Sequence, residues 1–257
     1  EALGEFHNMT LKLNDVLGLR IYPNWTPHED PFDTSSPPAP QTLRKLTSYR
    51  HQDLCYFTKK HGQLHHQDYI LSECGNDEIH VFKHPYEHVT YSQTPTFLNM
   101  LLIGKLDLDE SAADPEDFRL GGFALNMPQD EFFYAQNITF YNYGRTPLMS
   151  GCLGCNTGEF MKQGAYTYRL GGLKYVRSNV RVQWSRHFKQ IFWDLDGSLA
   201  GTPNSFVFPY YNFNAHEPLC SRLPSAVYDD SMLCVNTTVR RLEIDYVEPN
   251  PLDYTDL

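Results

Sequence analysis

The sequence predicts an all-β protein and, within that class, a parallel β-helix, a solenoid in which short strands stack coil upon coil. Short apolar runs rich in β-branched and aromatic residues recur along the chain, separated irregularly by Gly, Pro, Asn and Asp. Helical periodicity is hard to find, and few two-residue hairpin turns are present. Repeated strands without intervening helices favour the solenoid over an antiparallel sandwich, which stays the alternative.

The expected strands are short and mostly apolar rather than strictly alternating. In chain order they are residues 19–22, 79–82, 97–103, 137–141, 173–176, 180–184, 191–193, 206–210 and 242–247. Residues 31–40 are a Pro-rich loop, and residues 105–118 carry six acids in 14 residues, which predicts a solvated loop or a calcium-binding insertion. We expect residues 1–257 to form a single β-helix region whose last residues, 248–257, are an extended exit.

Composition and charge exclude several classes of protein. Hydrophobic residues make up 41% of the 257 residues, enough for a sizeable core, which argues against a disordered tail. No run approaches the roughly 18 apolar residues of a spanning helix, so we expect no membrane insertion in this segment. The net charge of −10 argues against nucleic acid and anionic membranes as partners, and it is compatible with calcium.

Cysteines and glycosylation sequons together indicate an oxidising, secretory compartment. The six cysteines are Cys55, Cys74, Cys152, Cys155, Cys220 and Cys234. The four sequons begin at Asn8, Asn24, Asn137 and Asn236. The chain starts at Glu1 without a signal-like apolar segment, so we expect a processed piece of a larger secreted or ectodomain polypeptide.

The cysteine spacing favours local disulfides, although six cysteines allow 15 connectivities. Cys152 and Cys155 form a CxxC pair without a second such pair, so a disulfide that pins a turn is favoured over a zinc site or a thioredoxin-like site. Because solenoids make local contacts, we expect the other two pairs to be Cys55 with Cys74 and Cys220 with Cys234. Each of these would close a short loop of the chain.

The stretch IFWDLDGSLAG, residues 191–201, is similar to the start of a dehalogenase-type phosphatase site, in which Asp194 would attack phosphorus. Only 63 residues follow Asp194, too few for the rest of such a domain, and they contain two cysteines and a sequon. We therefore expect a structural turn in which Gly197 allows the corner and the Asp and Ser side chains bond turn amides. A cation site, with calcium as the expected ion, is the alternative for Asp194 and Asp196, although the later bidentate Glu of an EF-hand loop is missing.

Histidines are concentrated in the second quarter of the chain. They are His51, His61, His65, His66, His80, His84 and His88. We expect surface or partly buried structural histidines. The alternative is a metal site, because residues one coil apart stack in a β-helix and His65 or His66 could align with His84 or His88. No HExxH, GxSxG or phosphate-binding Gly loop is present, and no residue can be assigned as catalytic.

Several motifs occur in the order and spacing of a known family. They are NDVLGLRIYPNWTPHEDP (14–31), PPAPQTLRKLTSYRHQ (37–52), HGQLHHQDYILSECGN (61–76), NITFYNYG (137–144), GGLKYVRSNVRVQW (171–184) and CSRLPSAVYDDSMLCVNTTVRR (220–241). This set resembles the right-handed parallel β-helix region of fibrocystin-like proteins that carry a G8 domain. More distantly, it is similar to the cell-surface hyaluronidases.

The resemblance implies a non-enzymatic structural or interaction module at a cell surface, with a ciliary surface as the more specific expectation. Its partners would be other extracellular polypeptides. The alternative is a hyaluronidase-like glycosidase or a glycan-binding β-helix, in which carboxylates along the solenoid would act on a polysaccharide. The catalytic elements of those enzymes lie nearer the G8 domain, so no catalytic residue is carried over to this chain.

Overall fold

The computed structural model describes residues 6–22, 25–60, 62–75, 77–83, 96–104, 124–126, 133–143, 148–150, 167–184, 191–210 and 218–239. Within these residues the protein is nearly all β and contains a single short helix, α1 (Ser225–Tyr228). This confirms the all-β class.

The strands form two sheets. The larger sheet contains β1 (His7–Lys12), β3 (Gln41–Tyr49), β5 (Leu64–Gln67), β6 (Ile70–Ser72), β8 (Thr96–Ile103), β10 (Phe133–Tyr141), β12 (Thr167–Gly171), β13 (Lys174–Val176), β15 (Ile191–Asp194), β16 (Ser205–Pro209), β17 (Cys220–Arg222) and β18 (Ser231–Cys234). The smaller sheet contains β2 (Leu17–Ile21), β4 (Leu54–Lys60), β7 (Asp77–Lys83), β9 (Leu125–Asn126), β11 (Leu148–Ser150) and β14 (Gln183–Trp184).

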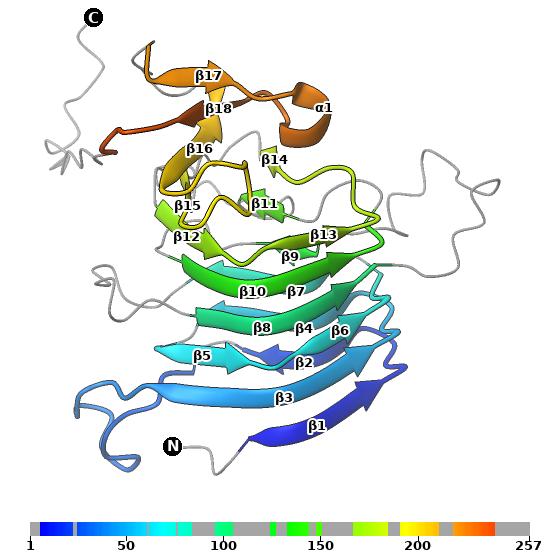
Figure 1. The fold of residues 1–257 in the computed structure, drawn as a ribbon. Coiled ribbons are helices and arrows are strands. Elements are labelled where there is room, and N and C mark those ends of the chain that lie inside the picture. The colour runs from blue at the N-terminus through cyan, green and yellow to red at the C-terminus, as the bar shows by residue number, and fades with distance from the viewer. Residues whose placement is uncertain are drawn as a thin grey trace, which may run out of the picture.

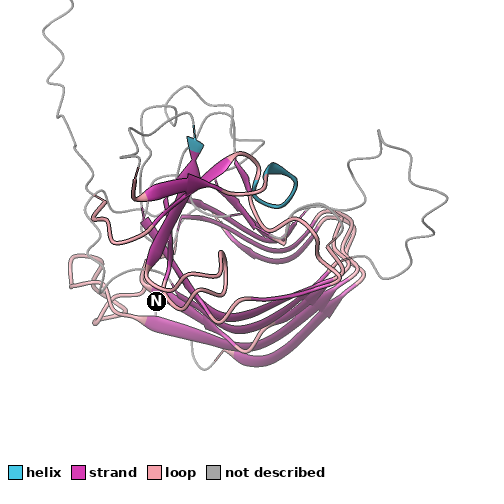
Figure 2. Cartoon of the chain, turned by 45° about the horizontal axis from the view of Figure 1, so that its top comes forward, coloured by secondary structure: helices cyan, strands magenta, loops and turns pink. Residues whose placement is uncertain are grey.

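From β1 to β15 the chain alternates between the two sheets, and each return places a new strand parallel to the previous one. In the larger sheet β3 pairs with β1, β5 and β6 with β3, β8 with both, and β10 with β8, all in parallel. The smaller sheet repeats this pattern from β2 to β14. Figure 1 shows the strands of successive coils lying one above another, and Figure 2 shows that these strands curve in the same way.

The pairing becomes antiparallel after β15, so the larger sheet is mixed, which differs from the all-parallel prediction. β16 pairs antiparallel with β15, β18 with β16, and β17 with β18. The connection 195–204 is short and returns directly beside β15, as an antiparallel pair allows and a parallel crossover does not. We call β16, β17, β18 and α1 the cap (Figure 1).

Hydrogen bonds tie the cap and its flanking residues Leu199 and Asp229 to the coil of β12 to β14. Arg181 Nη1 donates to the Leu199 carbonyl at 2.6 Å and to the Tyr228 hydroxyl at 3.0 Å. Trp184 donates its backbone N–H to the Asp229 carboxylate and its Nε1–H to Ser231 Oγ, each at 2.8 Å. The cap therefore covers the end of the stack through specific polar contacts as well as through backbone pairing.

Left-handed residues mark two corners of the larger sheet on most of its coils, although Gly104, which aligns with the second corner after β8, is not left-handed. Strand register aligns the residues at the first corner, with φ between +55° and +62°; they are Asn8, Lys45, Asp68, Asn99, Asn137 and Gly172. We call this set the first corner column. A second column aligns in the same way, with φ between +52° and +62°; it contains Leu13, Arg50, Glu73, Asn142 and Arg177.

The interior contains a continuous stack of rings, one from each successive coil. His66 lies parallel to Phe97 at 4.3 Å, and Phe97 lies 5.1 Å from Phe133. Tyr168 follows at 5.6 Å from Phe133, and Phe192 at 5.9 Å from Tyr168. Because aromatic pairs add about 0.5–1.5 kcal/mol each beyond area burial, the stack binds neighbouring coils along their common axis.

Several expected strands coincide with observed ones. Residues 97–103 correspond to β8, residues 137–141 to the second half of β10, and residues 191–193 to β15. β3 was not expected, because its outward positions are polar and Lys45 interrupts its alternation. The expected strand at 242–247 lies outside the described residues.

Candidate functional site: the Asp194 turn and the Cys55–Cys74 corner

The Asp194 carboxylate organises the turn that follows β15. Asp194 is the last residue of β15 and is fully buried. Its Oδ1 accepts a hydrogen bond from the Gly197 N–H at 3.1 Å, and its Oδ2 accepts one from the Ala200 N–H at 2.8 Å. Gly197 has a φ of +83°, a left-handed conformation that glycine adopts without a side-chain penalty. The stretch DLDGS is therefore a turn built around a buried acceptor.

Asp196 and Ser198 join this turn to the preceding coil. Asp196 Oδ2 accepts a hydrogen bond from the Gly172 N–H at 2.6 Å, and Ser198 Oγ accepts one from the Leu173 N–H at 2.9 Å. Asp196 Oδ1 also accepts from the Ser198 N–H at 3.0 Å. These side chains satisfy amides of two successive coils, as expected for a structural turn.

The two carboxyl groups are perturbed in opposite directions. Burial raises the pKa of Asp194, although amide donors at Ala200, Leu199 and Gly197 partly offset this. Burial also opposes ionisation of Asp196, but hydrogen bonds from Ser198 and the Gly172 amide outweigh it, and the pKa of Asp196 lies below its usual value. Asp196 is therefore the better-stabilised anion of the pair.

This arrangement does not suit a nucleophile, because both oxygens of Asp194 face amide donors and the side chain is inaccessible. Across the part of the chain that the structure describes, no three His, Cys, Asp or Glu side chains gather to hold a metal ion. Calcium at Asp194 and Asp196 stays a prediction, which calcium titration of wild type and Asp196→Asn would test. The acidic segment 105–118 and the extended exit 248–257 lie outside the described residues.

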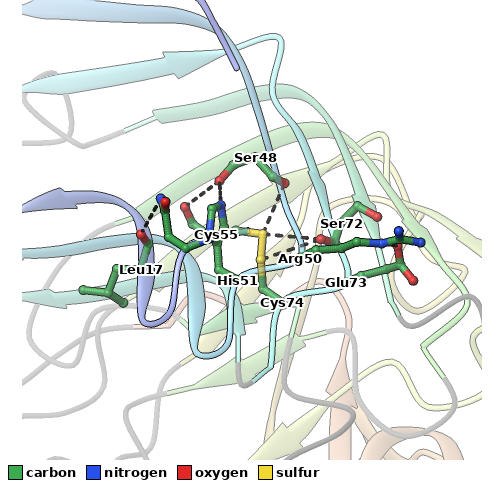
Figure 3. Close-up of a disulfide and its surroundings, with 9 residues drawn as sticks. Leu17, Ser48, Arg50, His51, Cys55, Ser72, Glu73 and Cys74 are labelled. Carbon is green, nitrogen blue, oxygen red and sulfur yellow. Dashed lines mark hydrogen bonds and ion pairs between the residues drawn. A yellow bond between two sulfur atoms is a disulfide. The ribbon is translucent and has the colours of Figure 1, made fainter. Parts of the chain in front are cut away.

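A second candidate is the buried pair Ser48 and His51, whose Oγ and Nε2 lie 2.9 Å apart (Figure 3). The Asn14 N–H donates to His51 Nδ1 at 3.1 Å, so this nitrogen is the acceptor and Nε2 carries the proton. Ser48 Oγ donates to the Cys55 carbonyl at 3.1 Å and therefore accepts from His51. Since a nucleophilic serine must instead donate to its histidine, this pair is structural.

The pair lies against a disulfide between Cys55 and Cys74, which links two successive coils at their corner (Figure 3). Ser48 O lies 3.3 Å from the Cys55 sulfur, and Gly18 packs so closely that a Cβ there would collide with the Cys55 carbonyl and the Ser48 hydroxyl. At the same corner, Arg50 and Glu73 form an ion pair at 2.9 Å, in which the Arg50 side chain is exposed and the Glu73 side chain is largely covered. The corner joins the first three coils through covalent, polar and steric contacts.

The other described cysteines, Cys220 and Cys234, are directly opposite one another on β17 and β18 and form a disulfide within the cap. All four described cysteines are therefore in the local pairs that the sequence favours. Cys152 and Cys155 lie outside the described residues. Disulfides of this kind are typical of proteins that fold in an oxidising compartment.

The alternative of a histidine metal site is wrong about which residues stack. Strand register places Thr96 and Phe97 on one side of His65 and His66, in the positions expected for His84 or His88. His66 is buried, donates from Nδ1 to the Thr96 carbonyl at 3.2 Å and accepts from the Tyr56 hydroxyl at 2.7 Å. His66 is therefore a core residue. The alignment could not be read from sequence spacing because the loops between coils vary in length. His61, His84 and His88 lie outside the described residues.

Three sequon asparagines are described, and each is exposed in a left-handed conformation. Asn8 has a φ of +57°, Asn137 of +58° and Asn236 of +53°. Their exposure fits glycosylation, which stays a prediction, while Asn24 lies outside the described residues. Asn8 and Asn137 occupy equivalent positions of the first corner column.

Sequence reasoning missed the two corner columns. Lys45, Arg50 and Glu73 adopt left-handed conformations that these residue types rarely take, so nothing in the sequence marked them. Asn99 and Asn137 were the available signal, because asparagine is enriched in this conformation. Their spacing hides the repeat, since 31 residues separate Asp68 from Asn99 and 38 separate Asn99 from Asn137.

Comparison with known proteins finds no matching family model and no matching solved structure. The chain is similar to fibrocystin from Mus musculus, with 31% identity over an alignment of 113 residues that covers 40% of this chain. It spans only 3% of the length of that relative, so the relationship is distant. None of the helices formed by the described residues is long and apolar enough to cross a membrane.

Proposed function

We propose that this chain is a right-handed parallel β-helix that acts as a non-enzymatic structural and interaction module of a fibrocystin-like extracellular protein. The observation that carries the proposal is the first corner column, in which a left-handed residue recurs at the same register position from β1 to the end of β12. The corner repeats although the loops between strands differ in length. This favours a solenoid in which the backbone of each coil turns at the same position. Such a body is long, stiff and suited to presenting side surfaces.

Side chains along the column support the rigidity that this function requires. Asn137 Nδ2 donates to Asn99 Oδ1 at 3.1 Å, and Asn99 Nδ2 donates to the Asp68 carboxylate at 3.1 Å. These hydrogen bonds connect successive coils on the outer surface, in the same direction as the aromatic rings that stack in the interior. Surface hydrogen bonds and interior ring contacts thus restrain the same coils.

Two observations support an extracellular setting. The described disulfides suit an oxidising compartment, and the similarity to fibrocystin points to the same class of protein. The partners would then be other extracellular polypeptides of a surface assembly. A ciliary surface is the more specific form of the proposal, and imaging of a tagged chain in ciliated cells would test it.

The interaction part is tested by cross-linking mass spectrometry on cells that display the protein. We expect repeated cross-links to other extracellular polypeptides. Recovery of the chain without any such link, on cells where neighbouring surface proteins do cross-link, would contradict it.

The non-enzymatic part is tested against the glycosidase alternative. Wild type and the double variant Asp194→Asn, Asp196→Asn are incubated with hyaluronan, with and without calcium, and the polymer length is followed by viscosity. We expect no change with either protein. Shortening of hyaluronan by wild type would overturn the non-enzymatic assignment, and loss of that activity in the variant would place it at this turn.

A further inference from the structure

The outer face of the larger sheet carries two rows of side chains between its two corner columns. Strand register aligns the first row as Thr47, Ile70, Leu101, Thr139 and Lys174, and the second row as Tyr49, Ser72, Ile103, Tyr141 and Val176. We call these two rows the lateral face; its strands β3, β6, β8, β10 and β13 lie one above another in Figure 1. Alternate side chains such as Leu71, Leu102 and Phe140 are fully buried, so the two rows point outward.

The middle of the lateral face is apolar and uncharged. Ile70 is 45% exposed and Val176 is 41% exposed, and Leu101, Ile103 and Tyr141 are each partly exposed. The strands β6, β8 and β10 contain no Asp, Glu, Lys or Arg. Neighbouring exposed apolar side chains of this kind mark interaction sites on soluble proteins.

Basic residues border this apolar middle at both ends of the rows. Arg44 and Lys45 lie on β3, Lys174 lies on β13, and Arg177 directly follows β13; all four are exposed. Among the described residues, Arg44, Lys45 and Lys174 make no ion pair with a carboxylate. The Arg177 guanidinium lies 5.8 Å from the centre of the Tyr141 ring, beside the second row. These cations are therefore available to carboxylates of a partner.

The coils that carry the lateral face are basic, although the chain as a whole is acidic. Residues 41–50, 64–75, 96–104, 133–143 and 167–178 contain six Lys or Arg and two Asp or Glu, a net charge of +4, whereas the whole chain has a net charge of −10. Both acids are already engaged, because Asp68 accepts a hydrogen bond from Asn99 and Glu73 pairs with Arg50. Complementary charge of this kind selects acidic partners and speeds their association.

We propose that the lateral face binds an acidic extracellular polypeptide whose apolar side chains cover the middle of the rows and whose carboxylates meet the basic residues at both ends. This inference rests on the interaction function proposed above, and it names the surface and the chemistry of the partner. Strands of a sheet lie about 4.8 Å apart, so the steps from β3 to β13 separate the basic ends by about 19 Å. An extended polypeptide spans this distance with about six residues.

The distribution of charge favours a polypeptide over an anionic polysaccharide. A uniformly charged polymer that lay along the rows would meet cations only at the two ends. Its remaining anions would lie over Ile70, Leu101 and Ile103, where they would lose water without gaining a hydrogen bond or an opposite charge. A polypeptide avoids this cost, because an apolar segment can separate its acidic residues.

The experiment measures binding of two labelled peptides of identical composition by fluorescence anisotropy. The spaced peptide has three glutamates at each end and six uncharged, largely apolar residues between them, a length of about 20 Å for the middle. The block peptide has the same residues with all six glutamates in the middle. At about 0.15 M salt, where exposed charges more than about 8 Å apart are largely screened, we expect the spaced peptide to bind at least fivefold more tightly.

A matched pair of variants locates the binding surface. Arg44→Glu with Lys174→Glu reverses one charge at each end of the lateral face and should weaken binding of the spaced peptide at least tenfold. Arg20→Glu with Arg222→Glu changes the net charge by the same amount at exposed positions of β2 and β17 and should bind it within twofold of wild type. Thermal unfolding checks that both proteins are folded. Equal losses in the two double variants would overturn the assignment to this face.

A third variant tests the apolar middle and does not depend on charge. Ile70→Thr keeps a β-branched residue at an exposed position and should weaken the spaced peptide about twofold to fivefold while leaving the block peptide unchanged. Displacement of the spaced peptide by heparin would assign the face to an anionic polysaccharide and overturn the proposal. Self-association of wild type that Arg44→Glu with Lys174→Glu abolishes would assign it to a second copy of the chain, with the same consequence.

Cross-linking on cells separates this inference from the function on which it rests. We expect wild type to cross-link to other extracellular polypeptides and Arg44→Glu with Lys174→Glu to lose most of these links. Links that persist in this variant would overturn the lateral face as the binding surface and leave the interaction function standing. Absence of links from wild type itself, on cells where neighbouring surface proteins do cross-link, would contradict the interaction function.

Discussion

The two ends of the described stack differ in how other strands cover them. At the last coil, the antiparallel cap covers the interior, and the Asp194 turn supplies acceptors for amides that would otherwise end unpaired. Among the described residues, β1 and β2 are the terminal strands of their sheets, and apolar residues such as Met9 are partly exposed. The comparison shows that equivalent positions of the stack differ in burial according to whether described strands cover them on one side or on both.

The largest expected effect comes from a matched pair of core truncations. Leu46→Ala removes a fully buried side chain and should lower the free energy of unfolding by about 2–5 kcal/mol. Met9→Ala, at the opposing position of the first described coil, should cost less than half as much, because Met9 is only partly buried. Urea unfolding of both variants checks this, and equal losses would show that the first coil is covered.

Removal of the corner disulfide should be next in size. Cys55 and Cys74 are 19 residues apart, and the chain-entropy model assigns such a cross-link about 3 kcal/mol. The double variant Cys55→Ser, Cys74→Ser should lose about that much on urea unfolding. The control is Cys220→Ser with Cys234→Ser, whose separation of 14 predicts a similar loss at the capped end. A loss below 1 kcal/mol at the corner would mean that polar contacts hold the coils without the cross-link.

The Asp194 turn should contribute a smaller amount. Asp194→Ala leaves the amides of Gly197 and Ala200 without their acceptor, which should cost about 1–3 kcal/mol. Asp194→Asn keeps an acceptor of the same shape and should cost less, since burial already disfavours the charged form. Thermal unfolding ranks the two, and a more damaging Asn substitution would show that the negative charge itself is needed.

The smallest expected effect is a pH dependence at the Cys55–Cys74 corner. Burial lowers the pKa of His51, so the unfolded chain binds its proton more readily than the folded chain. The contribution of His51 is therefore fully present above the usual histidine pKa of about 6.5 and is lost as the pH falls through the lower folded value.

The measurement compares urea midpoints of wild type and His51→Gln at pH 7.5 and 5.5. Wild type should lose more stability on acidification than the variant. His65→Gln is the matched control, because burial lowers the pKa of His65 in the same direction but outside the corner. If wild type and His51→Gln lose the same stability between pH 7.5 and 5.5, His51 is not the cause of the pH dependence.

Part of the fold and of the site could be predicted from the sequence because it depends on local chemistry. Apolar runs between turn residues gave the all-β class and the strands around residues 97–103 and 191–193. The Asp-Leu-Asp-Gly-Ser order gave a turn, since Asp and Ser bond nearby amides and Gly197 tolerates a left-handed φ. Close cysteine spacing favoured the two described disulfides.

The remaining features depend on which residues distant in sequence become neighbours. Only the tertiary structure decides those neighbours. Loops of unequal length set the register, so His66 stacks on Phe97 and Asn137 reaches Asn99 across 38 residues. The left-handed Lys45 and Arg50 are imposed by neighbouring coils against their own preferences. Likewise, the direction of β16 beside β15 depends on pairing between strands rather than on residue type.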